Sequence, residues 1–190
     1  MIKDLIIKNR SYRRFYQDAA IEKQTLRDLV DLARLSASAG NMQSLKYILS
    51  CEPQKNADIY QHLRWAAYYK DWPGPIEGER PAGYIIILCD TSISTNYFCD
   101  HGIASQSILL GATERGLGGC IFASIDREGL KKTLNIDDKF EILLVIALGK
   151  PKEKVVLEKV APDGNIKYWR DESAVHHVPK RSLDEIIIEL

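Results

Sequence analysis

The sequence has no excess charge of either sign, and this limits the partners that the chain can have. Its 26 lysine and arginine residues are balanced by 26 aspartate and glutamate residues. Nucleic-acid-binding domains usually carry a basic excess or a basic stripe, so the balance argues against a nucleic-acid partner. Any site for an anion must therefore be a local cluster of cations.

The sequence also lacks long apolar runs and closely spaced cysteines. Its longest apolar stretch, 142–148, is far shorter than the roughly 20 residues of a membrane-spanning helix, so no membrane partner is expected. The first ten residues mix charged and aliphatic side chains and lack the apolar core of a signal peptide. No CxxC pair occurs, and the cysteines are interpreted as buried thiols in a reducing compartment: Cys51, Cys89, Cys99 and Cys120. Together these features predict a cytoplasmic protein.

The composition is sufficient for one folded domain. A length of 190 residues fits a single domain, 1–190, and 45% hydrophobic residues can bury a sizeable core. Apolar periodicity and capping residues predict helices over 2–8, 25–36, 102–115 and 126–134. Apolar runs predict strands over 46–50, 84–89, 118–122, 141–148 and 184–190. The interleaved pattern indicates an α+β fold with a mixed sheet, followed by a polar, loop-like segment after residue 151.

Two basic segments lie near opposite ends of the chain. Three arginines and a serine fall within residues 10–14, among them Arg10, Ser11 and Arg13. They suit a phosphate because arginine offers a bidentate fork and serine a short hydrogen bond. Lys180 and Arg181 could complete such a site. Taken singly, each segment is equally well described as a solvated basic turn or pair.

Two further segments could hold a flat ligand. Ser38, Ala39, Asn41 and Gln43 lie in a loop after the second predicted helix, where small residues permit close backbone approach and amides can pair with ligand carbonyl and N–H groups. An ordinary helix-to-strand loop is the alternative. The glycine-rich segment 116–124 lacks the GxGxxG spacing and follows a helix, so it is not a dinucleotide fingerprint. It predicts a tight turn whose following residues present backbone N–H groups.

Other catalytic motifs are missing from the sequence. Neither GxSxG nor GxxxxGK[ST] occurs, which excludes a hydrolase elbow and a P-loop. Cys99 and His101 have no second ligand pair at zinc spacing, so core positions are predicted for them. The adjacent His176 and His177 are interpreted as a loop pair.

In their order and separations, the four segments resemble the nitroreductase family. That family typically shows Arg-Arg-Ser-x-Arg-x-Phe near the N-terminus and Pro-Ser-x-x-Asn-x-Gln-Pro after the second helix. A Gly-Leu-Gly turn follows its long central helix, and a basic pair precedes a terminal strand. The resemblance spans nearly the whole chain. It implies a mixed central sheet flanked by helices and a homodimer that exchanges the C-terminal strand, with residues 151–190 packing on the partner subunit.

The resemblance also implies which residues bind the cofactor FMN. Arg10 and Ser11 would hold the phosphate, to which Lys180 and Arg181 would return, and Arg13 would lie near N1 and O2 of the flavin ring. One departure is Asn9, which stands where the first arginine of the motif is usual. The phosphate site would then have one cation fewer.

The remaining positions would contact the flavin ring. By resemblance, Ser38, Asn41 and Gln43 contact the flavin of the partner subunit, although the two prolines of that motif are replaced here. Backbone groups near Ala123 and Ser124 would lie against flavin N5. The flanking cofactor-binding positions that the resemblance implies are Tyr12, Ala39, Gly118, Gly119 and Phe122.

The implied activity is that of an enzyme. FMN would take hydride from NADH or NADPH and pass it to a small electron-poor acceptor, a nitroaromatic, quinone or enone, in a ping-pong reaction. Hydride chemistry belongs to flavin N5, so no catalytic side chain is required, and a guanidinium near N1 would stabilise the negative charge of the reduced ring. The alternative is a carrier or sensor that binds FMN without turnover.

An aromatic cluster lies beside the proline-rich segment 72–75. It consists of Trp65, Tyr68, Tyr69 and Trp72. Core or interface packing is the simpler interpretation. A lid over the flavin that selects the substrate is the other, because loops of this kind often carry function.

Overall fold

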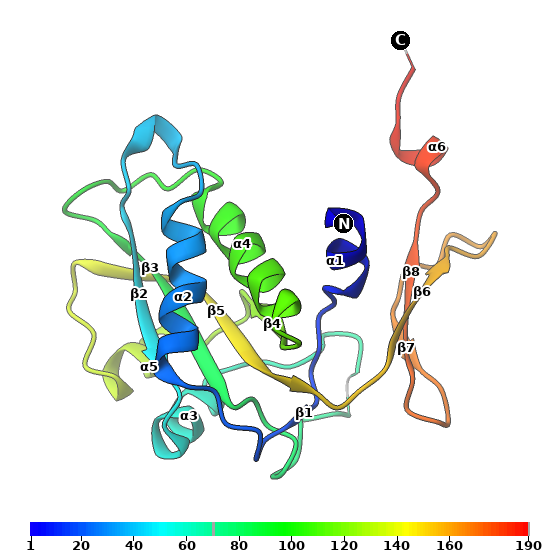
Figure 1. Cartoon of the computed structure of the whole chain (residues 1–190), viewed down its shortest axis with the longest axis horizontal. Coiled ribbons are helices and arrows are strands. Elements are labelled where there is room, and N and C mark those ends of the chain that lie inside the picture. The colour runs from blue at the N-terminus through cyan, green and yellow to red at the C-terminus, as the bar shows by residue number, and fades with distance from the viewer. Residues whose placement is uncertain (70, 190) are drawn as a thin grey trace.

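The computed structural model describes residues 1–69 and 71–189, and it places a central sheet between helices with a smaller sheet at one side (Figure 1). The helices are α1 (Ile2–Lys8), α2 (Lys23–Arg34), η1 (Ala39–Asn41), α3 (Pro53–Tyr60), α4 (Asp100–Glu114), α5 (Arg127–Thr133) and α6 (Leu183–Ile186). The strands are β1 (Phe15–Tyr16), β2 (Leu45–Ser50), β3 (Gly83–Asp90), β4 (Gly118–Phe122), β5 (Phe140–Pro151), β6 (Val155–Lys159), β7 (Trp169–Arg170) and β8 (His176–Lys180).

Strand β5 organises the larger sheet. It pairs with β3 along one edge and with β4 and β1 along the other, while β2 extends the sheet beyond β3, and all of these ladders are antiparallel. A parallel bridge joins Ser11 to Gly119 at the β4 edge. In the smaller sheet β8 pairs parallel with β6 and antiparallel with β7. The predicted α+β fold with mixed strand pairing is confirmed.

Every residue of β3 is buried, because apolar side chains pack against both faces of the central sheet. Ile85 and Ile87 point to the side covered by α2 and α4, whereas Ile86 and Leu88 point to the side covered by α3 and α5. Such burial on both faces explains why the strand is a continuous apolar run in the sequence.

The small residues of α4 serve this chain's own packing. A Cβ atom at Gly111 would collide with Leu32 and come within 3.1 Å of Leu29, both on α2. The sequence predicts a close helix neighbour here, and that neighbour is α2 of the same chain. These small residues therefore give no support for a dimer interface along α4.

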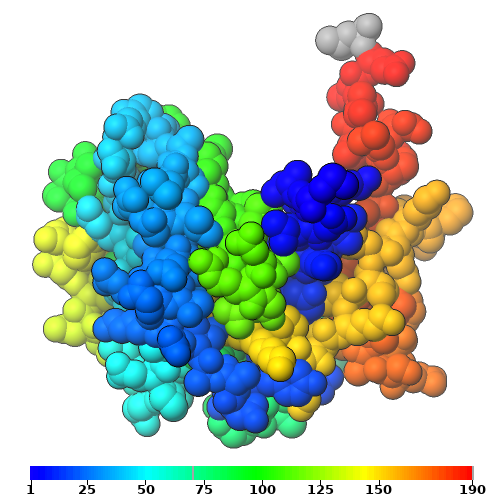
Figure 2. Space-filling view, viewed as in Figure 1, coloured from blue at the N-terminus to red at the C-terminus, as the bar shows by residue number. Residues whose placement is uncertain are grey.

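The C-terminal region differs from the sequence prediction in two ways. The segment after residue 151 contains three strands, and the adjacent His176 and His177 lie on β8 and not in a loop. The predicted strand 184–190 is wrong over its described residues, because residues 183–186 form the short helix α6. Ser182 caps this helix: its side chain accepts a hydrogen bond from the Glu185 backbone in a capping box. This tail projects from the body of the molecule (Figure 2), and its aliphatic side chains are exposed: Leu183, Ile186, Ile187 and Ile188.

The cysteines are only partly as predicted. All four are free thiols, with Cys89 and Cys120 buried, Cys51 half-buried and Cys99 exposed. A core position for Cys99 is therefore wrong. Within the described part of the chain, no helix combines the length and apolar character needed to cross a membrane.

His177 ties the smaller sheet together through two carboxylates. Its Nδ1 contacts Glu158 of β6, its Nε2 lies 3.2 Å from Asp171, and its ring stacks on Trp169 at 4.1 Å. The contact with Glu158 is the main cause that raises the pKa of His177, and the contact with Asp171 raises this pKa further.

This raised pKa predicts how the stability of the chain depends on pH. A pKa that is higher in the folded state favours folding below the ordinary histidine pKa, and this contribution is lost as the pH rises through the folded value. We expect the thermal midpoint to fall with rising pH in the neutral range, and this fall to be smaller in His177→Gln. Thermal unfolding at a series of pH values measures it. His101→Gln, at a histidine without a carboxylate contact among the described residues, should retain the wild-type dependence; an equal fall in His177→Gln would contradict the assignment.

Candidate functional site

The two basic segments meet at one cavity. A hollow of about 320 Å³ is lined by Arg10, Ser11 and Arg13 from the N-terminal motif and by Lys180 at the end of β8. Residues 10 and 180 are brought together because β5 leads directly from the β1 pairing into the smaller sheet. The predicted convergence of these segments is therefore present within a single chain.

The cations at this cavity have no carboxylate partners. Among the described residues, Arg10, Arg13 and Lys180 form no ion pair, and the arginine side chains reach only backbone oxygens, those of Ile6 at 2.6 Å and Ser11 at 3.2 Å, and a histidine. The Nε atom of Arg10 is buried with no hydrogen-bond partner, and burial lowers the pKa of this guanidinium. Cations without a carboxylate partner favour an anion, the more so where they are partly buried like Arg10 and Arg13, and the FMN phosphate carries about −1.5 to −2 charges. The residues present thus fit FMN.

Arg14, unlike Arg10 and Arg13, binds a carboxylate of the chain. Its guanidinium binds the Glu79 carboxylate at 2.5 and 2.7 Å, and Lys152 adds a contact at 3.0 Å. The hydrogen bond from Arg14 lowers the pKa of Glu79 to about 2. This arginine anchors the N-terminal segment to the loop before β3 and is not free to bind a ligand.

Glu153 fixes the backbone of the first motif. Its side chain is 1% exposed, and its carboxylate accepts from the backbone N–H groups of Arg13 and Arg14 and pairs with Arg170 at 2.8 Å. The carboxylate therefore holds the Arg13 main chain while leaving its side chain for the cavity. A lone glutamate in a charged segment gives no sequence signal for this role.

The second motif is held by Asp100 at the start of α4. Asp100 is buried, and it accepts from Ser38 Oγ at 2.7 Å and from the Ala39 backbone at 2.9 Å. Ser38 Oγ in turn accepts from the Gln43 backbone at 3.0 Å. Asn41 and Gln43 both have φ near 54°, an uncommon backbone for residues other than glycine and one that recurs at binding sites.

The second motif does not reach the first within one chain. Ser38, Asn41 and Gln43 line a separate cavity of about 220 Å³ between α2, β2 and α4. The two motifs therefore lie at separate cavities of the chain.

The glycine-rich segment packs directly on the first motif. The Tyr12 backbone donates to the Gly119 carbonyl at 3.0 Å, and a Cβ at Gly118 would collide with the Tyr12 ring. The Phe122 ring is committed to the core, 4.6 Å from Trp65, so only its backbone could contact a ligand. Ala123 and Ser124 follow as exposed residues.

The two residues of the basic pair at the end of β8 lie in different surroundings. Lys180 lines the cavity, whereas Arg181 is exposed and lies 3.5 Å from Glu185 on α6. Val178 and His176 share the Lys180 face because alternate strand residues point the same way. This alternation points to His176 only once residues 176–180 are known to form a strand.

Cys120 lies close to the first motif but is not poised as a nucleophile. It is buried on β4, and burial raises its thiol pKa to about 11. The reactive form of a cysteine is the thiolate, which this environment disfavours. We expect Cys120→Ala to keep turnover within a small factor of wild type, as steady-state kinetics would show. A loss of several orders of magnitude with FMN still bound would indicate a thiol mechanism.

The aromatic cluster packs mainly within the chain. Trp65 is 8% exposed in the core, whereas Tyr69 and Trp72 lie against the Arg170 guanidinium at 5.0 and 4.6 Å. The Tyr68 ring lies tilted against that of Tyr168, with ring centroids 4.7 Å apart and an interplanar angle of 49°. Core packing is confirmed for Trp65, and the lid stays a prediction.

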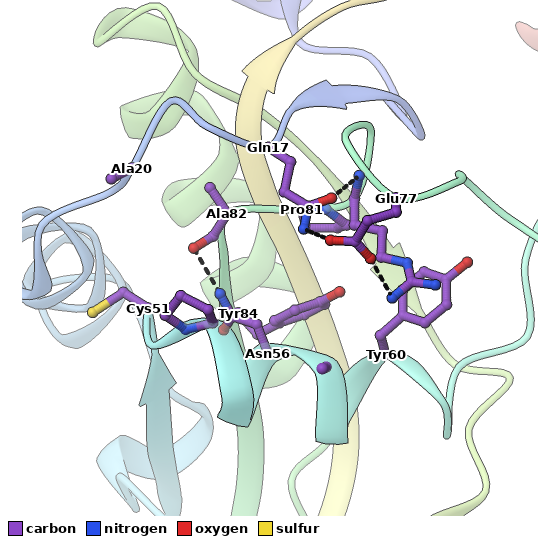
Figure 3. Close-up of a pocket in the computed structure, with 12 residues that line it drawn as sticks. Gln17, Ala20, Cys51, Asn56, Tyr60, Glu77, Pro81, Ala82 and Tyr84 are labelled. Carbon is purple, nitrogen blue, oxygen red and sulfur yellow. Dashed lines mark hydrogen bonds and ion pairs between the residues drawn. The ribbon is translucent and has the colours of Figure 1, made fainter.

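A third cavity, of about 180 Å³, lies beside α3 (Figure 3). Asn56 donates to the Ala82 carbonyl at 2.8 Å, and Gln17 and Glu77 hydrogen-bond each other at 2.5 Å. Arg80 pairs with the same glutamate at 2.8 Å. Its cation is thus compensated within the chain, in contrast to the cations at the 320 Å³ cavity, which we take as the candidate site.

Comparison with known proteins shows the family of the chain. A profile described as the Nitroreductase family matches residues 6–150. The chain is 26% identical over 184 residues to a Bacillus subtilis (strain 168) protein named NAD(P)H nitroreductase MhqN, covering 78% of this chain and 87% of the relative. It is 22% identical over 202 residues to the 4-nitrobenzoate reductase of Pseudomonas putida, covering 83% and 88%.

Solved structures show the same fold. A nitroreductase family protein from Streptococcus pneumoniae TIGR4 aligns with a TM-score of 0.71 at 19% identity and covers 100% of both chains. An FMN-dependent nitroreductase from Clostridium difficile R20291 aligns with a TM-score of 0.67 at 21% identity, covering 81% of this chain and 89% of that one. The sequence resemblance is confirmed: the chain belongs to the nitroreductase family and is an oxidoreductase.

Proposed function

We propose that the chain is an FMN-dependent oxidoreductase that uses NADH or NADPH to reduce a small electron-poor acceptor. The observation that carries this proposal is the cavity between the N-terminal motif and β8. Arg10, Arg13 and Lys180 line it without carboxylate partners among the described residues, and a buried Arg10 Nε lacks any hydrogen bond. These are the features of a site built for a phosphate-bearing ligand.

The chain's own residues bind and orient the cofactor. When bound, FMN would supply the redox chemistry, taking hydride from the nicotinamide and delivering it to the acceptor. Arg10, Ser11 and Lys180 would hold the phosphate. Arg13 would place positive charge beside the ring where negative charge accumulates on reduction, which lowers the energy of that state. No side chain is assigned a covalent role.

A homodimer would complete the site. The second motif lies in a cavity of its own, so a flavin at the first motif can meet Ser38 or Gln43 only from another copy. The exposed aliphatic tail after β8 has no cover in the single chain and would pack on the partner. The acceptor class is proposed from the family and from relatives whose names specify nitroreductase and 4-nitrobenzoate reductase activity.

Anaerobic spectroscopy tests the proposal directly. The purified protein, loaded with FMN, should be yellow, should bleach with NADH or NADPH, and should regain colour when a nitroaromatic, quinone or enone is added. Protein that binds FMN but does not bleach with either nucleotide would support the carrier or sensor alternative. Protein that takes up no FMN would refute both.

A further inference from the structure

His176 is the buried histidine at the inner side of the cofactor cavity. It is 1% exposed and lies on β8, two strand positions before Val178 and four before Lys180. Its Nε2 lies 3.4 Å from Arg13 Nη1, and its Nδ1 lies 2.7 Å from the Tyr69 hydroxyl. The Tyr168 ring also contacts both His176 and the Arg13 guanidinium, with centroid distances of 5.2 and 4.8 Å.

The chemistry of these neighbours determines where the imidazole proton lies. A guanidinium has donors only, so His176 Nε2 must be the acceptor of the Arg13 hydrogen bond. The proton of the neutral ring then lies on Nδ1, which donates to the Tyr69 hydroxyl oxygen. Burial, with the positive charges of Arg13 and Arg170, lowers the pKa of His176 to about 4.

We propose that His176 is a positioning residue whose neutral imidazole aims the Arg13 guanidinium into the cofactor cavity without neutralising it. A carboxylate in this place would cancel the charge of Arg13, and a cation would repel it. The carboxylate nearest to the motif, Glu153, binds the Arg13 backbone and Arg170 instead. The inference rests on the proposed function, because the positive charge of Arg13 has its role only when a flavin ring is bound beside it.

Nitrogen NMR of the histidine side chains in the FMN-free protein tests the geometry without the cofactor. His176 should be neutral with its proton on Nδ1 throughout the range from about pH 5 to pH 8. Tyr69→Phe removes the acceptor at Nδ1 but leaves the Arg13 donor at Nε2, so the proton should stay on Nδ1 in this variant as well. A proton on Nε2 in the wild type, or titration of His176 within this range, would overturn the proposal.

Binding of FMN and of riboflavin, which lacks the phosphate, tests the role. His176→Phe fills the space without an acceptor, and it should weaken both ligands by the same factor of about ten, because the ring contact of Arg13 is lost. His176→Gln, whose amide can both accept and donate, should recover most of that loss. The midpoint potential of bound FMN should become more negative in His176→Phe, since reduction would lose the stabilising charge.

Two binding results would overturn the proposal. The first is a riboflavin affinity of His176→Phe equal to that of the wild type. The second is a loss of affinity in His176→Gln as large as in His176→Phe, which would indicate that His176 serves packing alone. If His176→Phe does not fold, Tyr69→Phe tests the same role, because it removes one of the two hydrogen bonds that orient the imidazole. Both ligands should then be weakened by a smaller factor, and unchanged binding would overturn the proposal. A wild-type protein that binds neither ligand would refute the proposed function, whereas the NMR result would still stand.

Discussion

Replacing Arg10 with alanine is expected to weaken FMN binding by at least about tenfold. The Arg10 guanidinium lines the candidate site, and its Nε is buried without a partner. Removing one partner of a buried charge pair costs roughly 2–5 kcal/mol, and the half-buried position of Arg10 places the effect at the lower end. Riboflavin affinity should change little, because riboflavin has no phosphate. Titration of the FMN-free protein by flavin fluorescence measures both constants.

Lys180→Ala should show the same selective loss, and Lys159 provides the matched control. Lys159 pairs with Lys180 in the parallel register of β6 and β8 and is exposed like it, but only Lys180 lines the cavity. Lys159→Ala therefore removes one positive charge from the same sheet without touching the site. An unchanged FMN dissociation constant in Arg10→Ala would remove that residue from the phosphate site.

Deleting residues 183–190 is expected to convert a dimer of 21.5 kDa chains into monomers and to abolish tight FMN binding. Ile186, Ile187 and Ile188 are 63%, 53% and 84% exposed in the single chain, which is unusual for three successive aliphatic residues. Obligate interfaces cover such surface, and a flavin that needs both subunits would be lost with them. Strand β6 still pairs with β8 at Lys180, so the loss of FMN would follow from the loss of the partner. Sedimentation and FMN titration of both proteins measure the effect.

A full-length variant separates apolar burial from chain length. Serine at positions 186–188 should reproduce the deletion, whereas serine at Asp184 and Glu189 should leave the dimer intact. A truncated monomer that binds FMN tightly would show that the site is complete within one chain.

The elements that bury apolar side chains could be predicted from the sequence. Strands β3 and β5 are continuous apolar runs, and α2 places Leu26, Leu29 and Ala33 on one face. Helix α3 is missed because it buries only Ile59 and an asparagine, so it has no apolar stripe to detect. The tail is mistaken for a strand because its isoleucines dominate the pattern, whereas the capping box at Ser182 starts a helical turn.

The cofactor-facing cations could also be predicted, but the residues that orient them could not. Arg10 and Lys180 are recognisable as motif members, and the fold brings them together. Glu153, His176 and Asp100 act on motif residues that lie 61 to 163 residues away in sequence. Their roles depend on tertiary placement, which a single sequence without strand register does not specify.

The contacts of Asp100 have a consequence for the entropy of binding. Gly40, Asn41 and Gln43 have left-handed φ angles of 57°, 54° and 54°, and hydrogen bonds within the chain, from Ser38 to Asp100 and from Gln43 to Ser38, hold this loop. Fixing such a loop on binding would cost about 0.5–1.5 kcal/mol for each immobilised side chain, and more for the backbone. Here that ordering takes place when the chain folds. A flavin arriving from the other subunit would therefore meet a surface that has little conformational freedom left to lose.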